Sequence, residues 1–265
     1  MVINKLIKLF LVGLLLNSSI VVSAEAAAET VNKPEKGTVL ITGANRGLGL
    51  ALSRHFISDG YNVIGTARNP EKASDLKEAG ARVVQLDVTD DDSIAAMVKT
   101  LNGVPIDIVV NNAGYIAGLE RGIESFKHTH REAFLKTYNV NVIGPVMVTR
   151  ALLPNLELAT SEVKKVINIS SHGGIINRKK VKGIYSYDPT KSALNKITVD
   201  MSKDLAAYNI LVVALAPGHN KTRMGGENGQ LEPEFSMGKA KEVIQNLDMS
   251  NTGSFVGYSG FSIDW

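Results

Sequence analysis

The sequence predicts a single α/β domain built on a doubly wound parallel sheet with helices on both faces. Short, near-continuous apolar runs alternate with helical patterns from residue 37 onward, and the first run leads through a glycine-rich turn into a helix. Strands that are apolar along their whole length are typical of parallel sheets buried on both sides. Because the crossovers are right-handed, we expect a ligand at the C-terminal edge of the strands. A chain of 265 residues can bury such a core.

The glycine-rich turn is the segment 42–49, which reads Thr-Gly-Ala-Asn-Arg-Gly-Leu-Gly. A strand, a turn and a helix in this order aim backbone N–H groups and the positive helix end at one point, which suits a pyrophosphate. Gly43 would allow the tight turn, Gly47 the close approach of the phosphates, and Gly49 the packing of helix on strand. Taken alone, the turn fits an ordinary strand-to-helix loop as well.

The other elements continue the alternation. The apolar runs predict strands at 38–41, 61–67, 82–86, 106–110, 163–169, 210–215 and near 255–256. The helical patterns predict helices at 50–57, 71–79, 93–101, about 129–153, 187–208, and in the region after residue 234. The polar, glycine-rich stretch from Pro217 to about Glu234 is interpreted as a lid.

The N-terminal segment differs from the rest of the chain. Two lysines precede an uncharged, largely apolar run at residues 9–24, and small side chains occupy the end of that run. This pattern is typical of a signal peptide at residues 1–24, and cleavage after it predicts an exported protein, periplasmic or secreted. An uncleaved membrane anchor is the alternative, and a buried core helix is a third interpretation. Residues 25–36 predict a linker, which leaves 37–265 as the folded domain.

Charge and composition exclude several functional classes. The net charge of +3 is mild and the charged residues are interspersed, so we expect no nucleic-acid partner. The chain has no cysteine, which excludes disulfides, thiolate catalysis and cysteine-ligated metals. His128 and His130 are interpreted as capping or solvent-facing residues rather than metal ligands, and no metal site is predicted.

Tyr187 and Lys191 are candidate catalytic residues. They are four apart at the start of a predicted helix, so their side chains share one face. A neighbouring ammonium favours the phenolate and would lower the pKa of Tyr187 toward a value useful for proton transfer. The pair alone could also be structural. Ser170 and Ser171 end the fifth predicted strand, where a hydroxyl could bind a substrate oxygen or only cap the strand end.

Together these segments resemble the short-chain dehydrogenase/reductase family, in the carbonyl-reductase branch related to the sporulation C-signal proteins. The resemblance runs from about residue 37 to the C-terminus and rests on residues 42–49, 87–88, 111–114, 141, 169–171, 187–195, 217–218 and 222. It implies a single Rossmann-type sheet of about seven strands in the order 3-2-1-4-5-6-7. It also implies a small carbonyl or alcohol substrate and a homodimer or homotetramer.

The resemblance assigns roles to the candidate catalytic residues. Tyr187 would be the general acid in reduction, and Lys191 would lower the pKa of Tyr187 and hold the nicotinamide ribose. Ser171 would polarise the carbonyl, and it is preferred to Ser170 because the residues after it fit the family's serine, two residues, glycine pattern. Asn141 would hold the water chain that resupplies protons.

The resemblance also implies a dinucleotide site. Its predicted residues are Gly43, Asn45, Arg46, Gly47, Leu48, Gly49, Arg68, Asp87, Val88, Asn111, Ala113, Gly114, Tyr187, Lys191, Pro217, Gly218 and Thr222. An NAD site has an acidic residue after the second strand, and residues 65–69 contain none. Arg46 and Arg68 are instead placed to meet a 2′-phosphate, so NADP(H) is preferred and NAD(H) remains possible, although either arginine could be a solvated loop residue.

Some residues depart from the family pattern. The basic stretch 177–182 is interpreted as a solvated loop, with a preference for an acidic substrate as the alternative. His219, Asn220 and Arg223 leave the contacts of the lid and the substrate pocket open. The function predicted is an NADP(H)-dependent carbonyl reductase or alcohol dehydrogenase. The alternative is a dinucleotide-binding signalling or binding protein with little turnover, which would not need the proton donor.

Overall fold

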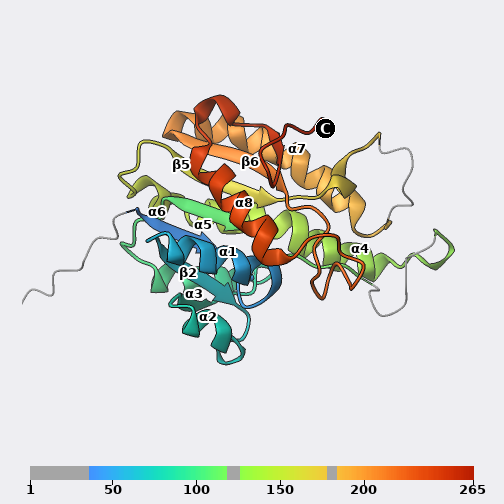
Figure 1. Ribbon diagram of the computed structural model, residues 1–265, viewed down its shortest axis with the longest axis horizontal. Helices are drawn as coiled ribbons and strands as arrows, with labels where there is room; N and C mark the ends of the chain where they lie inside the picture. Colours follow the sequence, from blue (N-terminus) through green and yellow to red (C-terminus); the bar gives the residue numbers. More distant parts are fainter. Residues whose placement is uncertain (1–35, 118–125, 178–183) are drawn as a thin grey trace, which may run out of the picture. The chain divides into compact units, whose positions relative to one another are not determined.

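The structure is a computed structural model that describes residues 36–117, 126–177 and 184–265 (Figure 1). The described residues all belong to one compact unit, Pro34–Trp265. The predicted signal peptide and all but the last residue of the predicted linker lie outside the described residues. Within the described residues, no helix combines the length and the apolar character that crossing a membrane requires.

A seven-stranded sheet forms the centre of the folded unit, in the order β3-β2-β1-β4-β5-β6-β7. The neighbouring strands all pair in parallel. The strands are β1 (Thr38–Ile41), β2 (Asn62–Ala67), β3 (Arg82–Gln85), β4 (Ile108–Asn111), β5 (Lys164–Ile169), β6 (Ile210–Ala216) and β7 (Phe255–Gly257). This confirms the predicted Rossmann-type fold and its strand order. The order reverses between β1 and β4, where such sheets open a crevice for ligands.

Helices cover both faces of the sheet (Figure 1). They are α1 (Gly47–Ser58), α2 (Ser74–Glu78), α3 (Asp91–Thr100), α4 (Arg131–Tyr138), α5 (Gly144–Ala151), α6 (Leu153–Glu157), α7 (Asp188–Leu205) and α8 (Pro233–Asn246). Short 3-10 turns are η1 (Pro70–Lys72), η3 (Phe126–His128), η5 (His172–Gly174), η6 (Ala206–Tyr208) and η7 (Met249–Asn251), and η4 (Asn139–Ile143) is a π-helical turn.

The apolar strand residues lie in two main cores, one on each face of the sheet. Val39 and Ile41 of β1 lie in the core that α1 and α8 close, and α1 and α8 pack side by side in front of the sheet in Figure 1. Leu40, between them, lies in the core that α3 and α5 close. Because successive side chains of a strand point to opposite faces, β1 must be apolar along its whole length.

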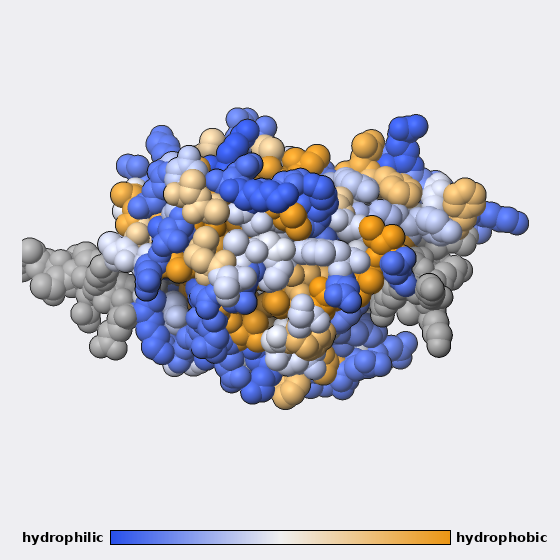
Figure 2. Space-filling model, turned by 90° about the horizontal axis from the view of Figure 1, so that it is seen from above, coloured by the Kyte–Doolittle hydropathy of each residue, from blue (hydrophilic) through white to orange (hydrophobic). Residues whose placement is uncertain are grey.

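The surface mixes polar and apolar side chains. On the face that Figure 2 shows, hydrophilic residues cover much of the described surface and hydrophobic residues lie between them in small groups. Folded proteins normally expose much apolar area, so scattered groups of this kind need no special explanation.

The long helical stretch predicted over about 129–153 is confirmed from Arg131 to Ala151, but it is not a regular α-helix. α4 continues at Tyr138 into the π-helical turn η4, which leads directly into α5, and α6 follows as a separate short helix. Pro145 and Pro154 lie in the first turns of α5 and α6. The predicted short helix 71–79 is divided into a 3-10 turn, η1, and the short α2.

Candidate functional site

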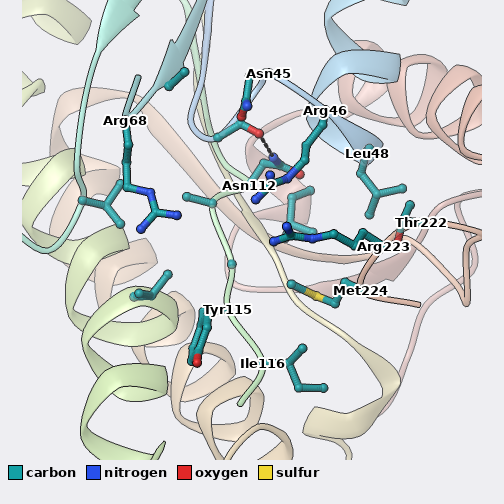
Figure 3. Close-up of a pocket in the computed structure, with 18 of the residues that line it drawn as sticks. Asn45, Arg46, Leu48, Arg68, Asn112, Tyr115, Ile116, Thr222, Arg223 and Met224 are labelled. Carbon is teal, nitrogen blue, oxygen red and sulfur yellow. Dashed lines mark hydrogen bonds between the residues drawn. The ribbon is translucent and has the colours of Figure 1, made fainter. Parts of the chain in front are cut away.

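A cavity of about 630 Å³ lies at the C-terminal ends of the strands. The ends of β1, β2, β4 and β5 reach it, together with the start of α7 and the segment after β6. Figure 3 shows labelled side chains from the segments that follow β1, β2, β4 and β6 around one shared space. The cavity therefore lies where the doubly wound topology predicts a ligand.

Most of the predicted cofactor residues line this cavity. They are Gly43, Asn45, Arg46, Gly47, Leu48, Arg68, Asp87, Val88, Ala113, Gly114, Tyr187, Lys191, Pro217 and Thr222. Of the other predicted residues, the structure does not place Gly49, Asn111, Gly218, Asn141 or Ser171 in the lining. The basic stretch 177–182 lies outside the described residues except for Asn177.

The glycine-rich turn needs its glycines for distinct reasons. Gly43 has a φ of +63° and a Cβ there would lie 3.0 Å from the Cα of Ala113, so a side chain would be strained and crowded. Gly47 has a φ of +55°, which also favours glycine. A Cβ at Gly49 would lie 2.5 Å from Nδ2 of Asn112, so this glycine lets α1 pack closely against the end of β4. Gly49 therefore contributes to the packing of the turn and does not line the cavity.

Thr42 and Asn112 hold the turn in place. The Thr42 hydroxyl accepts hydrogen bonds from the backbone N–H groups of Asn112 and Ala113, both at 3.0 Å. In return, Nδ2 of Asn112 donates to the carbonyl oxygens of Thr42 at 2.8 Å and Gly43 at 3.2 Å. Gly47 and Leu48, the first residues of α1, line the cavity, and no acidic side chain occupies the first turn of α1. A helix N-terminus of this kind attracts anions.

Asn111 lies in the sheet core instead of the cavity. Its Nδ2 donates to Thr149 Oγ1 at 3.0 Å and to Asn168 Oδ1 at 2.9 Å. Asn168 Nδ2 in turn donates to Thr198 Oγ1 at 2.9 Å. This buried network joins β4 and β5 to α5 and α7, whereas the neighbouring Asn112 lines the cavity.

Tyr187 and Lys191 meet at the start of α7. Tyr187 immediately precedes the helix, and Pro189 occupies its first turn as predicted. Lys191 is 5% exposed, and its Nζ donates to the carbonyl oxygen of Ile169, at the end of β5, at 2.8 Å. The same Nζ lies 5.5 Å from the centre of the Tyr187 ring. Both side chains line the cavity.

The two serines after β5 have different partners. The Ser170 hydroxyl is buried and donates to Asn195 Oδ1 at 2.5 Å, which ties β5 to α7. The Ser171 hydroxyl accepts from the backbone N–H of Gly173 at 3.0 Å and hydrogen-bonds the phenol of Tyr187. Ser171 is therefore the serine whose hydroxyl meets the phenol, although Ser170 has more contact with the cavity.

Electrostatics keep the phenol protonated. Burial raises the pKa of Tyr187, the charge of Asp188 raises it further, and the hydrogen bond with Ser171 opposes both effects. Burial also lowers the pKa of Lys191 to about 8. The expected lowering of the pKa of Tyr187 by Lys191 is not what the structure shows, because the ammonium faces the ring and the Ile169 carbonyl. At neutral pH the site thus presents a protonated phenol, Tyr187, beside the ammonium of Lys191, whose pKa burial has lowered.

Asn141 supports the site from the π-helical turn. Its side chain is 1% exposed. Its Oδ1 accepts from the backbone N–H of Tyr115 at 2.8 Å, and its Nδ2 donates to the Tyr115 carbonyl at 2.9 Å and to Thr190 Oγ1 at 3.1 Å. A π-helical turn often marks a functional position. Here the side chain joins the segment after β4 to the start of α7, and the predicted water-holding role stays a prediction.

Three arginines give the cavity a positive charge. Arg46, Arg68 and Arg223 all line it, and Figure 3 shows their guanidinium groups turned toward the same space. Among the described residues none of the three takes part in a salt bridge. Burial, and then the charges of Arg223 and Arg68, lower the pKa of Arg46. Unpaired cations at a helix N-terminus fit a phosphorylated dinucleotide.

Several lining residues were not predicted. They are Ala67, Leu86, Thr89, Tyr115, Ile116, Lys136, Asn139, Val140, Ile169, Ser170, Lys221, Arg223 and Met224, whereas Asn112 belongs to the segment 111–114 that the resemblance implies at this site. Most of them adjoin a predicted site residue or the π-helical turn, and that proximity is the signal that could have found them. Within the described part of the chain, no group of three or more metal-ligating side chains is present.

Comparison with known proteins identifies the family. Residues 37–232 match the family model described as short chain dehydrogenase. The chain is a short-chain dehydrogenase/reductase. It is similar to the NADPH-bound carbonyl reductase from chicken fatty liver, with a TM-score of 0.79 and 30% identity over 86% of this chain and 98% of that one.

Curated relatives agree with this assignment. The C-signal protein of Myxococcus xanthus is 31% identical over 161 residues, which are 61% of this chain and 93% of that protein. A serine 3-dehydrogenase of Rhizobium radiobacter is 31% identical over 232 residues, 82% of this chain and 86% of that enzyme. This short-chain dehydrogenase/reductase therefore belongs to the carbonyl-reductase branch, and it is an oxidoreductase with a nicotinamide cofactor and a small-molecule substrate.

Proposed function

We propose that this enzyme transfers hydride between NADP(H) and a carbonyl or alcohol substrate, with Tyr187 as the general acid in reduction. The observation that carries the proposal is the meeting of three groups beside one cavity: the protonated phenol of Tyr187 and the buried ammonium of Lys191 line it, and the Ser171 hydroxyl hydrogen-bonds the phenol. A protein that only binds a dinucleotide has no need of a proton donor placed in this way.

Each residue would have a separate task. The nicotinamide, when bound, supplies the hydride. Tyr187 would deliver its proton to the developing alkoxide, and Ser171 would donate a hydrogen bond to the same oxygen. Lys191, fixed by the Ile169 carbonyl, would place its positive charge and its remaining N–H groups beside the phenol and the ribose. In oxidation the same proton would return to the phenolate.

The preference for NADP(H) rests on charge. Arg46 and Arg68 line the cavity and form no salt bridge within the described part of the chain, and the N-terminal end of α1 lines the same space. A 2′-phosphate carries about two negative charges, which two guanidinium groups can neutralise. NAD(H) would lack this contact, so we expect it to bind more weakly.

The test uses purified protein and a panel of aldehydes and ketones. We expect saturable oxidation of NADPH with at least one of them, and a loss of about 10²- to 10⁴-fold in kcat for Tyr187→Phe with unchanged NADPH affinity. Tyr185→Phe, an exposed tyrosine nearby, is the matched control and should keep full activity. Tight NADPH binding with no turnover across the panel would favour the alternative of a binding protein.

Two further proposals concern assembly and location. We propose a homodimer or homotetramer, because α4 and the adjoining π-helical turn expose large apolar side chains, with Leu135 63% and Ile143 48% exposed. Light scattering tests this. We also propose export after cleavage of residues 1–24, with anchoring by that segment as the alternative. N-terminal sequencing of the protein recovered from its native cell tests which form exists.

A further inference from the structure

A third arginine in the cavity has no role in the chemistry above. Arg223 follows Thr222 in the segment 217–231, between β6 and α8, whereas Arg46 lies in the glycine-rich turn and Arg68 just after β2. Three cations from separate elements face one another across the cavity (Figure 3). Like charges brought this close repel one another, and an anion bound between them would relieve the repulsion.

Arg223 and Arg68 lie at different parts of the site. Thr222 packs against the glycine-rich turn, because a Cβ built on Gly47 would lie 3.6 Å from the Thr222 methyl group. Arg223 thus enters beside the N-terminus of α1. Arg68 lies on the side of Asp87: burial tends to raise the pKa of Asp87, but hydrogen bonds from Thr89 and the charge of Arg68 keep it below its ordinary value.

The segment that carries Arg223 is firmly built. The Thr222 hydroxyl accepts from the N–H of Gly225 at 3.0 Å, and the Lys221 N–H donates to the carbonyl oxygen of Leu231 at 2.9 Å. The ammonium of Lys221 pairs with Glu232. The charge of Lys221 is therefore paired with Glu232 at the start of α8, whereas the guanidinium of Arg223 forms no salt bridge among the described residues and stays available for a ligand.

We propose that Arg223 binds the pyrophosphate of the dinucleotide and thereby fastens the segment 217–231 over the bound cofactor. The inference rests on the proposed function in one respect, that the cavity holds a dinucleotide. Arg46 and Arg68 together can neutralise a 2′-phosphate, whereas the helix N-terminus alone offers the pyrophosphate only about half a positive charge. Arg223 supplies the missing charge at the place where Thr222 meets the turn.

Calorimetric titration with NADPH, NADH and adenosine 2′-monophosphate tests the assignment. The last ligand has the 2′-phosphate and lacks the pyrophosphate. Arg223→Gln should weaken NADPH and NADH by a similar factor, on the order of 10-fold, and leave adenosine 2′-monophosphate unchanged. The matched variant Arg68→Gln should weaken NADPH and adenosine 2′-monophosphate and leave NADH nearly unchanged. Unchanged thermal unfolding of each free variant shows that it is folded.

Hydrogen exchange gives a second readout. In the wild-type protein, NADPH should protect backbone amides of the segment 217–231, and Arg223→Gln should lose most of that protection. Selective weakening of NADPH and adenosine 2′-monophosphate by Arg223→Gln would overturn the proposal by placing Arg223 at the 2′-phosphate, and no weakening of any ligand would overturn it as well. Failure of the wild-type protein to bind either dinucleotide would instead refute the proposed function, and the proposal with it.

Discussion

The buried ammonium of Lys191 makes the stability of the protein depend on pH in a way that one substitution can isolate. Burial lowers the pKa of this lysine from the ordinary value of 10.5 to about 8, although its Nζ keeps one hydrogen bond to the Ile169 carbonyl. The unfolded chain therefore binds the proton more tightly than the folded protein does. Lys191→Met removes this titrating group while keeping a long side chain in the space.

The sign follows from proton binding. Below pH 8 both states carry the proton and the folded state bears the full penalty of a buried charge. Between pH 8 and about 10.5 the folded state has lost the proton while the unfolded state still holds it, so stability rises with pH across this window. Relative to Lys191→Met, the wild-type protein should gain roughly 2 to 3 kcal/mol of unfolding free energy between pH 7 and 10.

Urea unfolding at 25 °C, repeated from pH 7 to 10 without cofactor, measures the difference. The comparison of wild type with variant cancels the groups that titrate in both. Lys196→Met is the control for the loss of a lysine from the same helix, because the Lys196 side chain is 70% exposed. A difference between wild type and Lys191→Met that does not change with pH would refute the assignment of a poorly solvated ammonium.

Two further predictions concern the cofactor turn and the end of α8. Gly43→Ala should lower the free energy of unfolding by about 1 to 3 kcal/mol and weaken NADPH binding, because Gly43 combines a φ of +63° with a close backbone neighbour. Gly60 has a φ of +85° and no neighbour near its Cβ position, so Gly60→Ala, measured by the same chemical denaturation, gives the cost of the φ angle alone. Lys165→Met should lower the free energy of unfolding by about 2 kcal/mol, because the Lys165 Nζ donates to two of the last carbonyl oxygens of α8 at 2.8 Å. An equal loss of stability in the neighbouring variant Lys164→Met would contradict this reasoning.

The layout of the sheet could be predicted from the sequence because apolar strand residues and turn glycines act locally. Val39, Leu40 and Ile41 must all be apolar, since adjacent side chains enter different cores. Gly43 has a positive φ, which residues other than glycine rarely adopt, so a glycine at this position predicts a turn. Because each requirement restricts the residue type at a single position, the order of the elements and the glycine-rich turn could both be predicted from the sequence.

Other features depend on where a strand or a helix stops, and the sequence does not mark that point. Asn111 is still part of β4 and its side chain enters the core, whereas Asn112 lies just past the end and turns to the cavity. The π-helical turn that carries Asn141 likewise interrupts a pattern that reads as one continuous helix.

The pKa of Tyr187 and the meeting of Arg223 with Arg46 arise from tertiary packing. The spacing of Tyr187 and Lys191 predicts their proximity correctly, but it contains no information on which part of the phenol the ammonium faces. Burial then outweighs the expected effect of the charge. Arg223 is far from the glycine-rich turn in the sequence, so only the folded chain brings the two together.

The hydroxyl of Thr42 has a consequence for engineering this enzyme. One oxygen atom accepts two amide protons from a strand end about 70 positions further along the chain. A serine could keep both bonds, whereas a valine of the same shape would leave two amides unsatisfied beneath the phosphate-binding loop. Variants made to accept new substrates should therefore leave Thr42 unchanged, because its hydroxyl helps to hold the glycine-rich turn at the end of β1 to the segment that follows β4.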